Sequence, residues 1–75
     1  MQARIAGIQP LKFQNNAGET ISGTNLFCLF KDENVEGHKT EKFFIKDTIS
    51  LEGIKVNDVV ELHFSMKGKV EAINK

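Results

Sequence analysis

Few residues in this sequence have both the type and the spacing that catalysis or metal binding requires. The only histidines are His38 and His63, and the only cysteine is Cys28. His38 lies in a predicted loop, His63 on the outer face of a predicted strand and Cys28 on a core face, so we expect no shared metal site. Ser65 and His63 share a face, but no acid other than Glu71 is placed to orient the imidazole as a catalytic triad requires. We therefore predict no enzymatic activity, no metal and no other cofactor.

The residues best suited to binding form one patch of aromatic, lysine and amide side chains. The patch falls on the outer face of two strands predicted at residues 20–31 and 39–46. Its members are Asn25, Phe27, Leu29, Lys42, Phe44 and Lys46. Nucleobases stack on aromatic rings and lysines neutralise phosphates. We therefore predict that this patch binds single-stranded nucleic acid, DNA or RNA, with further phosphate contacts from Lys12 and Lys31.

The same patch has two other interpretations. Exposed Phe27, Leu29 and Phe44 together form an apolar surface that a partner protein or a second copy of the chain would cover. The alternative function is therefore a small interaction or dimerising barrel that uses this face. The third interpretation is ordinary packing, with the face covered by the chain's own first strand.

Composition limits the class of protein. The 75 residues suffice for one domain, residues 1–75, and 10 Lys and Arg are balanced by 10 Asp and Glu. Because the net charge is zero, nucleic-acid binding has to come from a local patch. The longest apolar run, Leu26 to Phe30, is too short for a transmembrane helix. A single cysteine excludes an internal disulfide and fits a reducing compartment, so we expect a cytoplasmic protein.

Short runs rich in Ile, Val and Phe, divided by Gly, Asn and Asp, predict an all-β protein. The predicted strands cover about residues 3–14, 20–31, 39–46, 58–65 and 69–73. We expect a bend or bulge at Gly7 or Pro10 and another bulge at Gly23, because the apolar residues change phase near these positions. A turn is predicted at residues 15–18, where Asn and Gly tolerate positive φ.

The connector between the third and fourth strands, residues 47–57, is predicted to hold a short helical turn. Asp47 or Thr48 is a suitable first cap, and Gly53 is a suitable end. This connector is long compared with the other loops.

The register of the second and third strands is predicted from the match of apolar residues. Pairing Lys31 with Thr40 places Phe27 opposite Phe44 on the outer face. On the core face it pairs Cys28 with Phe43 and Leu26 with Ile45. A shift by one residue would destroy both matches.

The last hairpin is predicted to turn through the three residues 66–68, which pairs Ser65 with Lys69. Gly68 then occupies the loop position that needs a left-handed backbone. This register places Phe64 opposite Val70, Leu62 opposite Ala72 and His63 across from Glu71. The predicted core consists of Leu26, Phe43, Ile45, Val60, Leu62 and Phe64.

Five short strands with one longer connector favour a small closed or nearly closed barrel. The order of three strands, a connector and two strands resembles an OB-fold. The stretch 53–62 is similar to the turn-Asp-x-Val entry to the fourth strand of OB and SH3-like barrels, with Asn57 where such barrels often carry Gly. The layout also resembles small single-stranded-DNA-binding barrels of phages and mobile elements of low-GC bacteria. That resemblance implies a non-enzymatic binding module whose face on the second and third strands carries aromatic and basic residues, here Phe27, Lys42, Phe44 and Lys46.

Overall fold

The computed structural model describes all 75 residues and contains five antiparallel strands in one sheet. The strands are β1 (Gln2–Gln14), β2 (Thr20–Phe30), β3 (Lys39–Lys46), β4 (Val59–Phe64) and β5 (Val70–Asn74). Their order in the sheet is β3-β2-β1-β4-β5, so β1 pairs with both β2 and β4. The prediction of five strands in an all-β chain is confirmed. No helix of the structure is long and apolar enough to cross a membrane.

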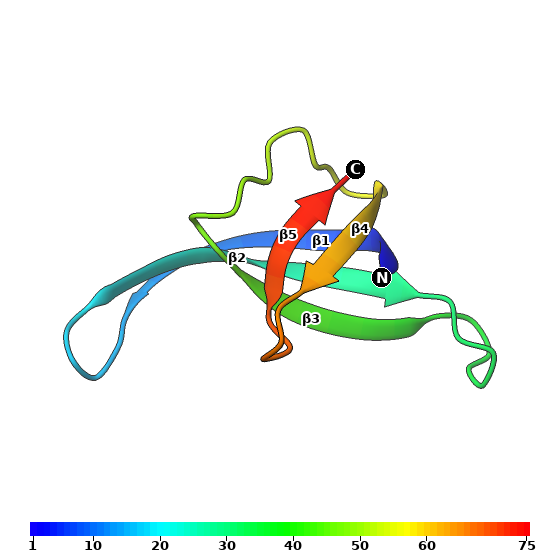
Figure 1. The fold of residues 1–75 in the computed structure, drawn as a ribbon, viewed down its shortest axis with the longest axis horizontal. Coiled ribbons are helices and arrows are strands. Elements are labelled where there is room, and N and C mark those ends of the chain that lie inside the picture. The colour runs from blue at the N-terminus through cyan, green and yellow to red at the C-terminus, as the bar shows by residue number, and fades with distance from the viewer.

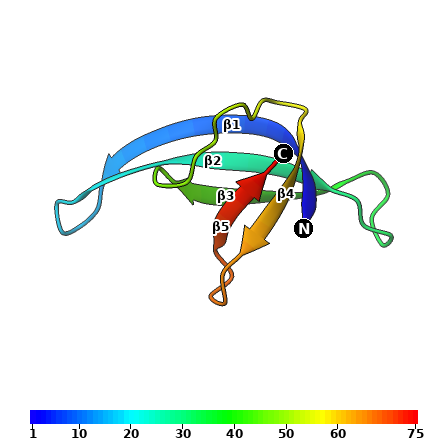
Figure 2. The same cartoon turned by 45° about the horizontal axis from the view of Figure 1, so that its top comes forward.

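The strands form a long curved part and a short hairpin that crosses it. β1, β2 and β3 run along the long direction of the molecule, and β4 and β5 cross them steeply (Figure 1). Seen from a second direction, the three long strands arch over this hairpin (Figure 2). The core fills the concave side of the arch. The opposite, convex side of β1–β3 therefore has no second layer of chain over it.

Eight apolar residues form the core, and no polar or charged side chain is buried with them. They are Ala3, Ile5, Leu26, Cys28, Ile45, Val60, Leu62 and Val70. The predicted core is confirmed in four of its six members. Phe43 and Phe64 are only half-buried, because they lie at an open end of the core where they line a pocket.

The first strand contains the bulge that its change of phase predicts. The register of β1 against β2 shifts between Ile5 and Gly7, so Ala6 is the extra residue. From Gly7 onward the register is unbroken through Pro10 to the end of the strand. The predicted irregularity is thus a bulge beside Gly7, the first of the two predicted positions, and no bulge lies at Pro10.

The bulge predicted at Gly23 is wrong, because β2 stays in register with both neighbouring strands at this position. Ile21 consequently lies on the convex side, opposite Phe13, and not in the core. The β1–β2 hairpin extends beyond the crossing strands (Figure 1). Side chains near the tip of this hairpin have no core to pack against. Burial therefore does not decide which side of the sheet each of them takes. The turn at the tip is as predicted, with Gly18 at φ 78°.

The predicted register of β2 and β3 is wrong by two residues. Leu26 pairs with Phe43 and Phe27 with Lys42, so Phe27 does not stand directly opposite Phe44. A shift of two residues leaves every side chain on its predicted face. Alternation of apolar residues cannot distinguish these two registers. The observed one places the ring of Phe44 against the backbone of Gly23.

The turn between β4 and β5 is confirmed in detail. The Ser65 N–H donates to the Lys69 carbonyl over 2.7 Å, and Gly68 has φ 79°. Phe64 pairs with Val70 as predicted. Beyond that pair a bulge at Glu71 shifts the register, so the predicted pairings of Leu62 with Ala72 and of His63 with Glu71 are wrong. The observed partners are Ile73 for Leu62 and Ala72 for His63.

The connector 47–57 contains turns and no helical turn, so that prediction is wrong. Ile49, Leu51 and Ile54 all pack against the core, and their spacing suits a chain that winds across the core better than a helix with one apolar stripe. Asn57 has φ 77°, a left-handed conformation that Gly and Asn adopt more readily than other residues. Its N–H donates to the Ile5 carbonyl over 2.7 Å and ties the connector to β1.

Two exposed ion pairs hold the chain ends. The Met1 ammonium lies 2.7 Å from Glu61 Oε1, and Lys75 Nζ lies 3.1 Å from Asp58 Oδ2. The hydrogen bond from the Met1 ammonium lowers the pKa of Glu61. The Lys55 N–H, and then Lys75, lower the pKa of Asp58. Both pairs are on the surface, so they contribute little to stability.

Candidate functional site

The convex side of β1, β2 and β3 presents one continuous set of side chains, which we call the outer face. Pairing along the strands places these residues on it: Arg4, Gly7, Gln9, Leu11 and Phe13 of β1; Ile21, Gly23, Asn25, Phe27 and Leu29 of β2; and Thr40, Lys42, Phe44 and Lys46 of β3. The bulge at Ala6 decides which residues of β1 belong to it. After the extra residue, the odd-numbered positions from Gly7 onward point outward.

Three phenylalanine rings are the main apolar feature of the outer face. Phe13 is 49% exposed, and Phe27 and Phe44 are each 39% exposed. The rings of Phe13 and Phe44 meet edge to face with centroids 6.5 Å apart. The predicted placement of Phe27 and Phe44 away from the core is thus what the structure has. Phe13 was not assigned to the site from the sequence. The feature that could have indicated it is the change of phase of the apolar residues in β1.

Glycines on the neighbouring strands make room for two of these rings. A Cβ atom at Gly23 would lie 2.4 Å from Cζ of Phe44 and 2.5 Å from the Ile45 carbonyl oxygen, so no larger residue fits there. A Cβ atom at Gly7 would lie 3.3 Å from Cδ2 of Phe27. Each ring therefore rests on backbone on one side. The remaining ring surface is open to solvent and available to a flat ligand.

The charge on the outer face is of one sign. Its ionisable residues within the strands are Arg4, Lys42 and Lys46, and no acidic residue of β1–β3 lies on it. The one acidic residue within β1–β3 is Glu41, which alternates with Lys42 and so points to the other side. Charges that are evenly spread along the sequence are therefore segregated in space. This segregation gives a neutral chain a local positive surface.

Two amide side chains lie between the rings and complete the polar part of the surface. Asn25 Nδ2 donates to Gln9 Oε1 over 3.4 Å, across β1 and β2. This long, exposed bond leaves Asn25 with its second N–H and its carbonyl oxygen, and leaves Gln9 with its NH2 group. Such groups can hydrogen bond to base edges, whose donors and acceptors are exposed when bases are unpaired.

Two lysines that the sequence assigned to the site lie elsewhere. Lys12 pairs with Ser22 on the opposite side of β1, so it does not reach the outer face. Lys31 lies beyond the end of β2 and lines a separate cavity, the mouth pocket. The two assignments rested on charge alone and not on the phase of the strand, and the structure brings neither lysine together with the rings of the outer face.

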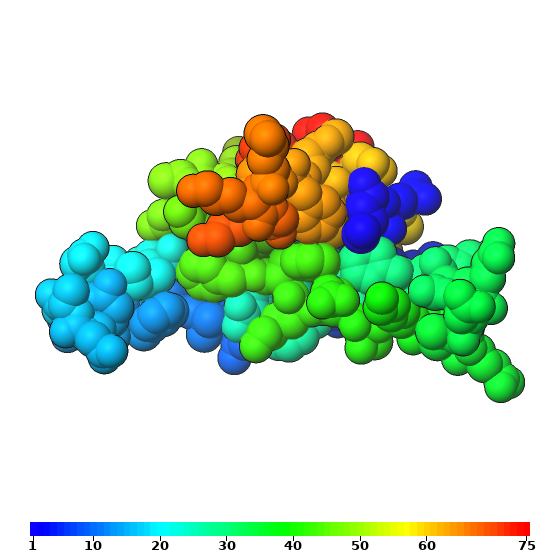
Figure 3. Space-filling view, turned by 60° about the horizontal axis from the view of Figure 1, so that its bottom comes forward, coloured from blue at the N-terminus to red at the C-terminus, as the bar shows by residue number.

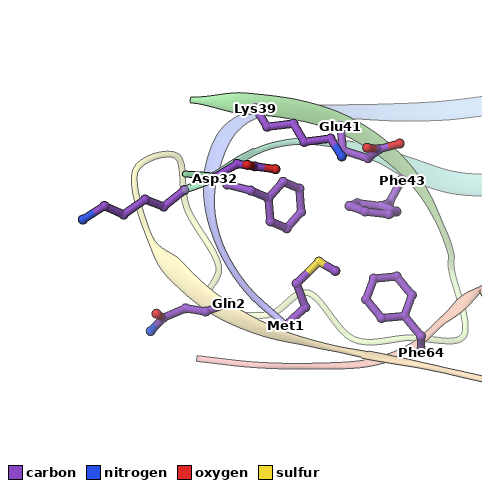
Figure 4. A pocket seen from close by; sticks show the side chains of 9 residues that line it. Met1, Gln2, Asp32, Lys39, Glu41, Phe43 and Phe64 are labelled. Atoms are coloured by element: carbon purple, nitrogen blue, oxygen red, sulfur yellow. The ribbon is translucent and has the colours of Figure 1, made fainter. Parts of the chain in front are cut away.

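The mouth pocket is a cavity of about 640 Å³ at the open end of the core. Phe43, Phe64 and the Met1 side chain face one another across it (Figure 4). The full lining is Met1, Gln2, Phe30, Lys31, Asp32, Lys39, Glu41, Phe43 and Phe64. Two acids and two lysines line the pocket together, so it lacks the single sign of charge found on the outer face.

The titratable groups that could serve catalysis are dispersed. The structure has no group of three or more His, Cys, Asp or Glu side chains that could hold a metal ion. Cys28 is buried and free, and burial raises the pKa of its thiol, so the reactive thiolate is disfavoured. His63 Nε2 lies 3.1 Å from Asn74 Nδ2, on the far hairpin.

No known family model, no curated protein and no solved structure matches this chain. The interpretation of its function therefore depends on the geometry and charge of the outer face.

Proposed function

We propose that this protein binds single-stranded nucleic acid on the outer face of β1, β2 and β3, without catalysing a reaction. One observation carries the proposal. Three half-exposed phenylalanine rings share that face with three cationic side chains, and no acidic side chain lies among them. Aromatic rings and cations in alternation are what a base–phosphate chain requires.

The pairing of β2 with β3 suggests how the contacts divide. Lys42 stands directly opposite Phe27, so a base on that ring has a cation beside it for the adjoining phosphate. Lys46 lies two residues from Phe44 on the same face of β3 and repeats the arrangement. Each stacked base contributes about 1–3 kcal/mol, and each lysine neutralises one phosphate.

The rings favour unpaired bases over a duplex. Phe27 and Phe44 rest on glycine backbone and do not project far from the sheet. Bases have to leave a helical stack to lie flat on such rings, which single strands do at low cost. Duplex binders instead use a helix, a ribbon or a strongly basic surface that tracks both backbones.

The architecture we propose for this function is an OB-like barrel. Its support is the pairing of β1 with both β2 and β4, together with the contact between β3 and β5 at the two ends of the sheet. Barrels of this class bind oligonucleotides on the face of strands 2 and 3. Closure of the barrel would depend on side chains between β3 and β5, since these two strands are not hydrogen-bonded neighbours.

A second copy or a partner protein is the alternative occupant of the outer face. The observation in its favour is the apolar pair Phe13 and Phe44, whose rings meet edge to face while 49% and 39% of these residues stay exposed. A dimer would bury these rings. It would also bring Lys42 and Lys46 of two copies together, which opposes close contact.

Salt dependence separates the two functions. For binding of a fluorescent oligothymidylate, we expect the logarithm of the affinity to fall with the logarithm of salt concentration with a slope of about −2, from three phosphate contacts at about −0.7 each. We also expect sedimentation to show a monomer when no oligonucleotide is added. Absence of binding at low salt would contradict the proposal. If the protein then sedimented as a dimer, the second copy would be the occupant of the face.

A further inference from the structure

We propose that a bound strand continues from the outer face around the edge of β3 into a neighbouring groove, where Lys69 contacts its backbone. This inference rests on the proposed function and extends its binding site to a second element. The groove, which we call the edge groove, lies between β3, the start of the connector and the β4–β5 turn. Its volume is about 610 Å³.

The edge groove is continuous with the outer face. Lys42, Phe44 and Lys46 belong to both, so the groove begins where the aromatic and cationic surface ends. The opposite wall is the β4–β5 turn, which lies against the residues that follow β3 (Figure 3). The complete lining is Lys42, Phe43, Phe44, Lys46, Thr48, Ile49, Ser65, Gly68, Lys69, Val70 and Glu71. A strand that leaves Phe44 over the edge of β3 thus enters this groove.

The charge of the groove suits a polyanion. Lys42, Lys46 and Lys69 line it, and Glu71 is its only acid. The mouth pocket, with two acids against two lysines, does not share this excess. The groove therefore offers an additional cation, Lys69, on the wall that faces β3.

The β4–β5 turn holds the backbone of Lys69 in a defined position. The Ser65 hydroxyl accepts hydrogen bonds from the N–H groups of Lys67 and Lys69, each over 3.3 Å. The Ser65 N–H donates to the Lys69 carbonyl over 2.7 Å, and Gly68 supplies the left-handed residue. The turn therefore fixes the point on the groove wall from which the Lys69 side chain extends toward a phosphate.

A path that bends around a sheet edge selects against duplex nucleic acid. Double-stranded DNA is stiff over roughly 150 base pairs, so it cannot follow a turn over a single strand of protein. An unpaired strand bends freely at each phosphate. The groove therefore extends the site for single strands alone.

Lys69→Ala tests the inference, with Lys67→Ala as the matched control. Both residues lie in the same turn and neither takes part in an ion pair, but only Lys69 lines the groove. The probes are oligothymidylates of about 4 and about 16 nucleotides, the limits of common site sizes. For the longer probe, we expect Lys69→Ala to reduce the salt slope by about 0.7. The affinity ratio across a tenfold change in salt then falls about fivefold. For the shorter probe, and for Lys67→Ala with either probe, the slope should stay unchanged.

Glu71→Gln supplies a test of opposite sign. Removing the only acid of the groove should strengthen binding of the longer oligothymidylate without changing that of the shorter one. If Lys67→Ala and Lys69→Ala have equal effects, or if Glu71→Gln has none, the groove is not part of the path, and the outer face stands alone. If the unsubstituted protein binds neither probe, the proposed function itself fails. Thermal unfolding of each variant confirms that the fold is retained.

Discussion

Leu26→Ala is expected to lower the free energy of unfolding by about 2–5 kcal/mol, the usual cost of truncating a buried leucine. Leu26 is 0% exposed and lies in the middle of β2, where it pairs with Ile8 and Phe43. At roughly 0.05–0.15 kcal/mol per residue, a chain of 75 residues has a total stability of about 4–11 kcal/mol. This one substitution therefore removes a large part of it, and equilibrium urea unfolding measures the loss.

Phe27→Ala is the matched control for this experiment. Phe27 follows Leu26 in β2 and points to the outer face, with its ring resting on Gly7. Its truncation removes a larger side chain but leaves no cavity in the core, so the expected loss is less than about 1.5 kcal/mol. A loss below about 1 kcal/mol for Leu26→Ala, or a larger loss for Phe27→Ala than for Leu26→Ala, would show that the two faces of β2 are assigned wrongly.

Replacing Phe27 and Phe44 together by alanine is expected to remove about 2–6 kcal/mol of the free energy of oligothymidylate binding. The figure is about 1–3 kcal/mol for each stacked base. The fold should persist, because none of the eight core residues is changed. Fluorescence anisotropy at constant low salt measures the affinity, and circular dichroism shows whether the sheet is retained.

A pair of lysine variants accompanies the double substitution. Lys42 lies on the outer face, whereas Lys12 lies on the other side of β1. Lys42→Ala should therefore reduce the salt slope by about 0.7, and Lys12→Ala should leave it unchanged. A folded double variant that binds within twofold of the unsubstituted protein would refute the role of the rings.

The faces of β3, β4 and the second half of β2 were predictable because they follow from local alternation. Val60 and Leu62 alternate with exposed neighbours in β4, and the structure buries both. Turn chemistry was equally local: Gly18 and Gly68 adopt the positive φ that their turns require. The two central rings of the candidate site, Phe27 and Phe44, followed from the same alternation.

The remaining features depend on how the strands meet. Registers that differ by two residues place the same side chains on the same face. The pattern of apolar residues therefore could not show that Phe27 pairs with Lys42 and not with Phe44. The bulges at Ala6 and Glu71 each add one residue to a strand, and this extra residue can be recognised only from the pairing with the neighbouring strand. The bulge at Ala6 reverses which positions of β1 point outward, and this places Phe13 on the outer face. The edge groove combines three separate segments and has no sequence pattern of its own.

The six phenylalanines provide the most direct test of the central claim. Three of them, Phe13, Phe27 and Phe44, lie on the outer face. The other three, Phe30, Phe43 and Phe64, line the mouth pocket. In an NMR titration with oligothymidylate at low salt, the ring resonances of the first three should shift. Those of Phe30 and Phe64, which line neither the outer face nor the edge groove, should stay in place. Shifts confined to the mouth-pocket rings, or no shift of any ring, would contradict nucleic-acid binding on the outer face.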